Sequence, residues 1–388
     1  MVNTNVSNET SMLDTYDGSI EGAMTETTDR ATEPERYNIL GAGVIGLTTA
    51  LELVREGHEV TLHSREGKPV LSSDSTSSNA VGQFLPWVPA EHAEALLGDV
   101  DLETVAEYSR IYYGELAKHA DQTGVMAVGN IELLLEGAEW PAGLPVAMRA
   151  EERELSNPIP FTEPDGESSN CKIMLEFETF SINTKKTIAY LADQAEKAGV
   201  KFVSTHIDVD KLEELDGVII NAMGIGAPDL DKATESNNFK GHTFIIEPED
   251  GYMPNQALSV EDLIIMPRED GTVICGALYI EDSAHPIPEE EEAEELFERL
   301  GKLLDAVAKE GIVGGLRLGL LEHSEVRLHS GGYRVELSDG GIRIAPDEEN
   351  ERLLHAYGFG GLGWSVGPHF AKRIAKQAKE LHKRIKEK

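Results

Sequence analysis

The first apolar segments of the chain predict a strand, a helix and a second strand in succession. A short apolar run at 37–40 leads into a helical pattern at 47–56, and Gly57 separates that helix from a second apolar run at 58–62. Residues 1–36 instead carry scattered single apolar residues among Thr, Ser, Asn, Asp and Glu, a composition that buries too little apolar surface to offset the entropy of ordering. We therefore predict a disordered polar tail followed by a β-α-β unit.

The middle of the chain repeats this alternation. Helical periodicity returns at 104–119 and at 184–197, and Gly199 supplies a stop signal after the second helix. Strands are expected next at 200–204 and 217–221. The second of these ends in glycine-rich residues, and we expect it to form a further edge of the first sheet.

After residue 239 the pattern turns to short apolar strands. Runs at 243–246, 263–267 and 272–275 predict strands, with Glu269-Asp270-Gly271 as a hairpin turn between the last two. The segment 289–309 has the pattern of an acidic amphipathic helix. The C-terminal half is thus expected to add a β-rich unit to the first sheet.

The charge balance excludes several kinds of partner. The 388 residues contain 34 Lys and Arg against 70 Asp and Glu, a formal net charge of −36. A field of that sign repels nucleic acid and anionic membranes, so neither is expected as a partner. No apolar stretch approaches the roughly 20 residues needed to span a bilayer.

Cysteine usage gives an expectation for the compartment. Only Cys171 and Cys275 are present, without the spacing of a disulfide framework or a zinc site. We therefore expect no metal and a reducing cytoplasm.

Chemistry enters at the turn after the first strand. Gly41-Ala42-Gly43-Val44-Ile45-Gly46 has the G-x-G-x-x-G spacing, in which the first glycine permits the tight turn, the second lets a pyrophosphate approach and the third lets helix and strand pack closely. Glu66 lies 20 residues beyond Gly46, where a carboxylate can bind a ribose hydroxyl. The Ser/Thr-rich segment 72–78 follows, with hydroxyls that can cap a helix beside the phosphates. This context predicts a dinucleotide site.

A second glycine-rich segment opens the last predicted helix. Gly358 to Gly363 precede a helix that runs from about Val366 to the end and becomes strongly basic. Glycines at a helix start allow a ligand to approach closely, and the helix N-terminus faces that ligand with positive potential. The basic residues at the other end complement the helix dipole.

Two such turns, one near each end of the chain, resemble the D-amino-acid oxidase family of flavoproteins. The resemblance covers most of residues 37–380. Its blocks are 37–66, Ala80-Val81-Gly82-Gln83, Ile220 to Gly224, Ile265 to Gly276, Arg327 to Glu336 and His355 to Phe359.

The resemblance implies an α/β fold with a Rossmann-like FAD-binding domain and an interleaved β-rich (α+β) substrate domain. The implied FAD-binding domain comprises 37–90, 181–236 and 338–388, and the implied substrate domain 91–180 and 237–337. The implied reaction is the oxidative deamination of a D-amino acid or related amine by hydride transfer to flavin N5. Dioxygen then accepts the electrons, so the products are an imino acid and H2O2. A homodimer is the oligomer to test.

The resemblance also assigns residues to the site. FAD is expected at Gly41, Ala42, Gly43, Val44, Ile45, Gly46, Arg65, Glu66, Ser77, Ser78, Gly82, Gln83, Ile207, Gly224, Gly360, Gly361, Leu362, Gly363, Trp364 and Ser365. Gly361 is also assigned a catalytic role, because it would set the N-terminus of the final helix against the flavin, where positive potential stabilises the charge of the reduced ring.

Arg327 is the candidate for the substrate carboxylate, which a planar guanidinium can hold in a bidentate contact. It precedes Arg334 by seven residues, a spacing similar to that between the family's carboxylate arginine and a later Arg-x-Glu. The alternative is a surface strand arginine paired with neighbouring acids. Two departures from the family pattern concern the substrate side: Leu328 stands where a proline is usual, and Ile264 where an active-site tyrosine is expected.

Three other functions stay open at this point. A nicotinamide-dependent dehydrogenase accounts for the first glycine turn but leaves the second unexplained. A flavin-dependent oxidase or dehydrogenase of a different amine, or a non-catalytic flavin-binding protein, accounts for both turns. Flavin absorbance separates the first of these from the others.

Overall fold

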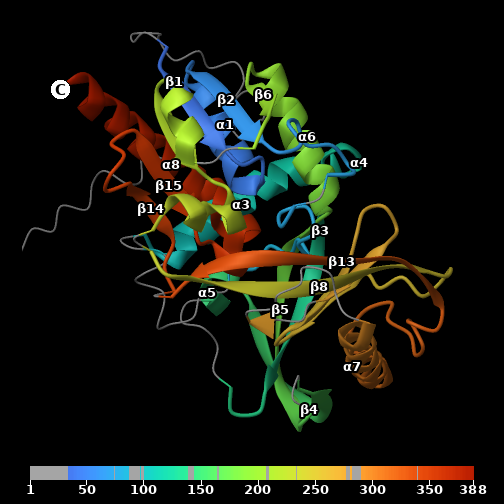
Figure 1. Ribbon diagram of the computed structural model, residues 1–388. Helices are drawn as coiled ribbons and strands as arrows, with labels where there is room; N and C mark the ends of the chain where they lie inside the picture. Colours follow the sequence, from blue (N-terminus) through green and yellow to red (C-terminus); the bar gives the residue numbers. More distant parts are fainter. Residues whose placement is uncertain are drawn as a thin grey trace, which may run out of the picture.

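The computed structural model describes residues 34–388 apart from 74, 87–96, 98–99, 139–143, 164–165, 207–208, 233, 277–279, 282–289 and 339. The predicted tail lies mostly outside the described residues. The first strand begins at Arg36, one residue inside the range predicted for the tail. In Figure 1 the long strands β8 and β13 cross the middle of the molecule, with a helix-covered sheet above them and α7 and β4 below.

The upper sheet, called sheet A here, has six strands in the order β14-β15-β7-β1-β2-β6. Their bounds are β1 Arg36–Leu40, β2 Glu59–Ser64, β6 Lys201–Ser204, β7 Val218–Asn221, β14 Arg343–Pro346 and β15 Leu353–Tyr357. All neighbours pair in parallel except β14 and β15. The expectation that β7 forms an edge was wrong, because β15 returns from the C-terminal part of the chain and pairs with its free side.

Helices pack on sheet A directly or through one another. The principal helices are α1 Val44–Arg55, α3 Leu102–Ala117, α6 Thr184–Lys197 and α8 Gly363–Lys386, and the short ones are α4 Ala120–Thr123, α5 Leu144–Met148, η3 Val209–Glu214, η4 Gly224–Leu230 and η5 Gly360–Leu362. Helix α1 packs against both α6 and α8, while α3, α4 and α5 also contact strand β3 or β5 of the second sheet. The largest apolar core lies between these helices and the sheet.

The lower sheet, called sheet B here, has nine strands in the order β12-β8-β11-β10-β9-β3-β5-β4, and β13 pairs with β8. Their bounds are β3 Val125–Leu135, β4 Glu151–Thr162, β5 Ser168–Ile182, β8 Ser236–Pro248, β9 Gln256–Val260, β10 Leu263–Pro267, β11 Val273–Gly276, β12 Ile280–Glu281 and β13 Ser324–Leu337. One face packs on α7 (Glu290–Glu310) through a second apolar core. The opposite face is turned toward sheet A and carries a smaller apolar cluster.

The predicted element types are confirmed for the helices at 104–119 and 184–197 and for the acidic helix at 289–309. The expected hairpin at 269–271 joins the antiparallel strands β10 and β11. Within the described part of the chain, no helix is both long and apolar enough to cross a membrane.

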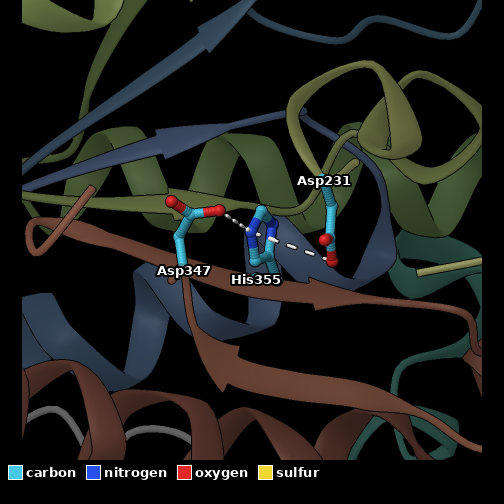
Figure 2. A group of neighbouring side chains, drawn as sticks. All are labelled: Asp231, Asp347 and His355. Atoms are coloured by element: carbon cyan, nitrogen blue, oxygen red, sulfur yellow. Dashed lines mark hydrogen bonds and ion pairs between the residues drawn. The ribbon is translucent and has the colours of Figure 1, made fainter. Parts of the chain in front are cut away.

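A buried cluster of charged side chains joins three separate segments of sheet A and its connections. His355 on β15 lies between Asp347, which follows β14, and Asp231, which follows η4 (Figure 2). His355 Nε2 is 3.0 Å from Asp347 Oδ2 and 3.8 Å from Asp231 Oδ2. Arg343 Nε and the Tyr357 hydroxyl each donate to Asp231 Oδ2 at 3.0 Å. We call Asp231, Asp347 and His355 the latch.

The proton on His355 is fixed by its neighbours. Asn221 Nδ2 donates to the Ala227 carbonyl at 3.0 Å and to His355 Nδ1 at 3.1 Å. When the imidazole is neutral, Nδ1 is therefore the acceptor, and Nε2 carries the proton that binds Asp347. A metal ion at this point would have to displace that proton and compete with Arg343 for Asp231, so the contacts favour a hydrogen-bonded latch over a metal site.

The latch carboxylates are held in their ionised forms. Burial alone would raise the pKa of Asp231, but His355, Arg343 and Tyr357 outweigh it and the pKa lies below its usual range. For Asp347 the same burial effect is outweighed by hydrogen bonds from His355 and from the Asn350 and Glu349 amides. Their contribution to stability is therefore present above about pH 4 and is lost as pH falls through the lowered values.

We expect Asp231→Asn to destabilise the protein by about 2 kcal/mol or more, because it leaves the partly buried Arg343 guanidinium without its counter-charge. Urea unfolding at pH 7 measures this change. The matched control is Asp216→Asn, which removes an exposed ion pair with Arg36 and should change stability by less than about 1 kcal/mol. Equal effects of the two substitutions would contradict a stabilising role for the latch.

Candidate functional site

The predicted dinucleotide turn lies at the carboxyl edge of sheet A, between the end of β1 at Leu40 and the start of α1 at Val44. Gly41 has φ +106°, and a Cβ built on it would lie 2.3 Å from the Ala222 carbonyl oxygen. A Cβ on Gly46 would lie 1.9 Å from the Gly41 oxygen. Only glycine fits at these two positions. Carboxyl edges of parallel strands are where α/β folds bind nucleotides.

The N-terminus of α1 is open to an anion. Its N-cap, Gly43, provides no side-chain cap, and the first turn contains no acidic residue. Ser77 Oγ accepts a hydrogen bond from the Val44 amide at 3.1 Å, as expected for a hydroxyl of the Ser/Thr-rich loop. Trp364 Nε1 donates to the Ser77 carbonyl at 3.0 Å and so ties this loop to the second glycine segment.

The two glycine segments meet in space. A Cβ built on Gly363 would lie 3.7 Å from Val44 Cγ1, and one on Gly367 would lie 3.0 Å from Ile45 Cδ1. Helix α8, like α1, begins without a side-chain cap and without an acidic residue in its first turn. Two helix N-termini without an acidic residue in their first turns therefore point to one region, which suits a pyrophosphate and an electron-rich ring.

A cavity of about 710 Å³ lies between this region and sheet B. One wall is formed by Val44, by residues 76–85 except for 78 and 84, and by residues 358–365. The facing wall is formed by sheet B: Glu132 on β3, Ser259 on β9, Ile264 on β10, and residues of β8 and β13. The hairpin between β9 and β10 closes one end with Glu261 and Asp262.

Many of the expected FAD positions line this cavity. They are Val44, Ser77, Gly82, Gln83, Gly360, Gly361, Leu362, Gly363, Trp364 and Ser365. Gly41, Ala42, Gly43, Ile45 and Gly46 form the turn and first helical residues next to it.

Four of the remaining expected positions lie away from the cavity lining. Arg65 and Glu66 are exposed immediately after β2. Gly224 begins η4, with nothing within 4 Å of a built Cβ. Ser78 is buried, where its hydroxyl accepts from the Ser75 amide at 2.8 Å and so shapes the loop. Ile207 lies outside the described residues.

Gly82 has a structural reason to be glycine as well. Its φ is +80°, and a Cβ would lie 2.1 Å from the Ile182 carbonyl oxygen on β5. The Ile182 amide donates to the Gly82 carbonyl at 2.7 Å. The loop that carries Gln83 is thus locked onto sheet B.

The assignment of the substrate carboxylate to Arg327 is corrected by the structure. Arg327 does not line the cavity. Its guanidinium donates to Glu247 at 2.6 Å and to Glu325 at 3.2 Å, and 48% of the side chain is exposed. The register of β13 against β8 shifts between Val326 and Leu328, so Arg327 is the extra residue of a β-bulge. The surface ion pair, held open as the alternative, is what the structure contains.

Arg334 is the arginine that lines the cavity among the described residues. A Cβ built on Gly361 would lie 3.0 Å from Arg334 Nη1. Arg334 therefore lies at the end of the cavity formed by the glycine segment. The opposite end, at Glu132, Glu261 and Asp262, has no cationic lining side chain among the residues described.

Sequence reasoning missed the most unusual residue of the facing wall. Glu132 is only 3% exposed and accepts a hydrogen bond from Ser259 Oγ. Burial raises the pKa of Glu132 to about 7, against the lowering effect of hydrogen bonds from Ser259 and Asn130. The available signal was one acid within the apolar run Ile131 to Leu135, two positions after Asn130 and therefore on the same face of the strand.

Comparisons with known proteins agree with this geometry. The family model described as FAD dependent oxidoreductase (DAO) matches residues 36–377. A D-aspartate oxidase of Talaromyces thermophilus is 25% identical over 370 residues, covering 88% of this chain and 94% of the relative. A D-amino-acid oxidase of Streptomyces coelicolor is 26% identical over 347 residues, covering 88% and 95%. The crystal structure of glycine oxidase from Geobacillus kaustophilus has the same fold, with a TM-score of 0.66, 18% identity, and coverage of 89% of this chain and 95% of that one.

The residues at the carboxyl edge of sheet A fit FAD. The turn at Gly41–Gly46 and the glycine start of α8 offer backbone amides and space, and neither α1 nor α8 has an acidic residue in its first turn. The Glu336 carboxylate lies beside this segment, since a Cβ built on Gly360 would be 2.6 Å from Glu336 Oε1. We expect Gly43→Ala to lower FAD affinity by about tenfold or more, because its Cβ would project toward Ser77 Oγ, only 2.8 Å away, in front of the helix. Fluorescence titration of the apoprotein with FAD measures the change.

The backbone of Gly43 has φ −79° and ψ −175°, which any residue adopts, so a loss of FAD cannot be attributed to backbone strain. Gly114→Ala in α3 is the matched control, since its Cβ would meet only Phe180 at 3.9 Å. It should leave FAD affinity unchanged. Undiminished affinity in Gly43→Ala would mean that the pyrophosphate lies elsewhere.

A second prediction concerns Arg327. Since its guanidinium pairs with Glu247 and Glu325 at a half-exposed position, Arg327→Ala should leave flavin content and kcat/KM within about twofold of wild type and change stability by less than about 1 kcal/mol. Arg334→Ala, inside the cavity, should lower the rate of flavin reduction by roughly tenfold or more. Steady-state and stopped-flow kinetics of the two variants measure this, and a steep loss in Arg327→Ala alone would return the catalytic role to Arg327.

Proposed function

The chain belongs to the DAO family of FAD-dependent oxidoreductases, and we propose that it oxidises the carbon–nitrogen bond of a small D-amino acid or related amine, with dioxygen as electron acceptor. The observation that carries this proposal is the cavity of about 710 Å³ between the FAD cradle and the face of sheet B. Both curated relatives named above oxidise D-amino acids by their names, and each is matched over 94% or more of its length.

FAD, when bound, would supply the redox chemistry, namely uptake of a hydride from the carbon that bears the nitrogen and transfer of the electrons to dioxygen to give H2O2, with hydrolysis of the imine product in water. The chain therefore has to bind, orient and exclude water. The α1 and α8 N-termini bind and polarise the cofactor. The nitrogen must be uncharged when the hydride leaves, so a substrate that binds as an ammonium group first gives up one proton.

Apolar side chains of sheet B and of the Gln83 loop cover part of the cavity. Val81, Ile245 and Ile264 pack on an apolar cluster of buried residues, and Val81 and Ile264 also line the cavity. Such a surface favours the loss of water around the reacting atoms. Cys171 and Cys275 are buried free thiols, which is compatible with the reducing cytoplasm proposed from the sequence.

A second candidate is an amine without a carboxylate. Two observations favour this candidate. Arg327 lies outside the cavity, and Arg334 lies at the end of the cavity that Gly360 and Gly361 form. With neither guanidinium at the end closed by Glu261 and Asp262, a substrate bound there is not held by its carboxylate. The two candidates share the same cofactor and the same bond cleavage.

The test is anaerobic mixing of the purified holoprotein with single compounds, followed by the loss of flavin absorbance. The panel contains neutral, acidic and basic D-amino acids, their L-enantiomers, and primary and secondary amines that lack a carboxylate. We expect at least one D-amino acid or amine to reduce the flavin, and one H2O2 to form per turnover when air is admitted. Reduction without peroxide would replace dioxygen by another acceptor. No reduction by any compound would leave a flavin-binding protein without this activity.

A further inference from the structure

The facing wall of the cavity contains a polar row that the proposed reaction does not use. Glu132 on β3 pairs in register with Ser259 on β9, and Ser259 pairs with Ile264 on β10. Neighbours in register point to the same face of a sheet. All three residues line the cavity, so one carboxylate lies next to an apolar surface at the place where a substrate is covered.

The shorter hydrogen bonds of this row run toward Glu132, while a longer one, from Ser259 Oγ to Asn130 Oδ1 at 3.5 Å, runs the other way. Gln83 Nε2 donates to Asn130 Oδ1 at 3.1 Å, Asn130 Nδ2 donates to Ser259 Oγ at 3.1 Å, and Ser259 Oγ donates to Glu132 Oε2. The chain of donors ends on the carboxylate, which has no proton to pass on when ionised. The arrangement therefore holds Glu132 as an acceptor with a fixed orientation.

The other charged groups around Glu132 do not neutralise it. Glu261 occupies the β9–β10 hairpin at φ +48° and its charge raises the pKa of Glu132 further. Asp262, beside it, is already paired with Arg299 of α7 at 2.6 and 2.8 Å. Cys171 on β5 has a thiol pKa raised to about 12 by burial and by Glu261 and Glu132, so it stays neutral.

This end of the cavity is thus an acidic pocket without a cation of its own among the described lining residues. A buried carboxylate is costly unless a positive charge or several hydrogen bonds stabilise it. An ammonium group offers both a positive charge and several hydrogen-bond donors. The apolar side chain of Ile264, which lines the cavity beside Ser259, offers a surface for the carbon atoms that such an ammonium group carries.

We propose that Glu132 binds the protonated amino group of the substrate, takes up the proton that this nitrogen must lose before the hydride can leave its carbon, and makes the protein prefer amines with positive charge at this end over acidic ones. This proposal rests on the proposed function and specifies its substrate class. Glu132 and Glu261 repel a second carboxylate, so an acidic D-amino acid is a poor substrate of this chain, although one relative is named a D-aspartate oxidase. Neutral and basic amines are the preferred substrates.

The experiment measures binding without turnover. Three probes with three carbon atoms each, n-propylamine, propionamide and propionate, are titrated into the holoprotein, and the perturbation of the flavin spectrum gives Kd. We expect n-propylamine to bind about tenfold or more tightly than propionate, and Glu132→Gln to remove that preference. Glu136→Gln is the matched control, because it removes the same charge just beyond the end of β3 from an exposed pair with Lys172.

The pH dependence separates a binding role from a packing role. The ammonium form of n-propylamine persists to about pH 10, so affinity should rise with pH as Glu132 ionises near pH 7. Glu132→Gln should be weak and flat over pH 6 to 8. Ser259→Ala removes a hydrogen bond that lowers the pKa of Glu132, so the midpoint of the rise should move to higher pH, and this variant keeps the test available if Glu132→Gln does not fold.

The outcomes for this inference and for the proposed function can be told apart. If n-propylamine binds through Glu132 but no compound reduces the flavin, the acidic pocket stands and the proposed activity fails. If a substrate is turned over while Glu132→Gln keeps its Kd, its preference among probes and its pH profile, the activity stands and Glu132 is not the ammonium site. Tighter binding of propionate than of n-propylamine also overturns the inference.

Discussion

The site depends on how closely the backbones of β1, α1 and β7 approach one another. At Gly41 the space for a side chain is taken by the Ala222 carbonyl, 2.3 Å from a built Cβ, and at Gly46 by the Gly41 carbonyl at 1.9 Å. A side chain at either position would push α1 away from the sheet. Because α8 packs on α1 through Gly367 and Ile45, the second glycine segment would move with it. Both helix N-termini, and with them one wall of the cavity, therefore follow from this contact.

Much of the fold could be predicted because its signals are local. Periodicity places α6 at Thr184–Lys197, and the strands at 263–267 and 218–221 need only a few residues to be recognised. Strand order is different, since β7 lies inside sheet A through pairing with β15, more than 130 residues later. A strand's own sequence contains no information about which distant segment will pair with its free side.

The cofactor side of the site was predictable for the same reason, and the substrate side was not. Glycine spacing is a local requirement, whereas the surroundings of Arg327 depend on the pairing of β13 with β8. Arg327 and Arg334 are seven positions apart, an odd number, so strand alternation alone points their side chains to opposite faces, and the two guanidinium groups lie in different surroundings. Glu132 is bonded to Ser259, which is 127 residues away in the sequence. From the sequence alone, this one acid in an apolar strand could not be recognised as part of a buried polar site.

The buried charge of Glu132 does not stabilise the fold, so we infer that it serves the site. Burial raises its pKa from the ordinary 4.5 to about 7, so between these values the folded protein holds a proton that the unfolded chain has released. Stability therefore falls as pH rises through this window, by on the order of 3 kcal/mol once Glu132 is ionised. Glutamine has the same shape and could accept the same hydrogen bond from Ser259 without that loss. A ligand that brings positive charge to the carboxylate lowers its pKa again and offsets the loss when it binds, so the unfavourable charge becomes a source of substrate affinity.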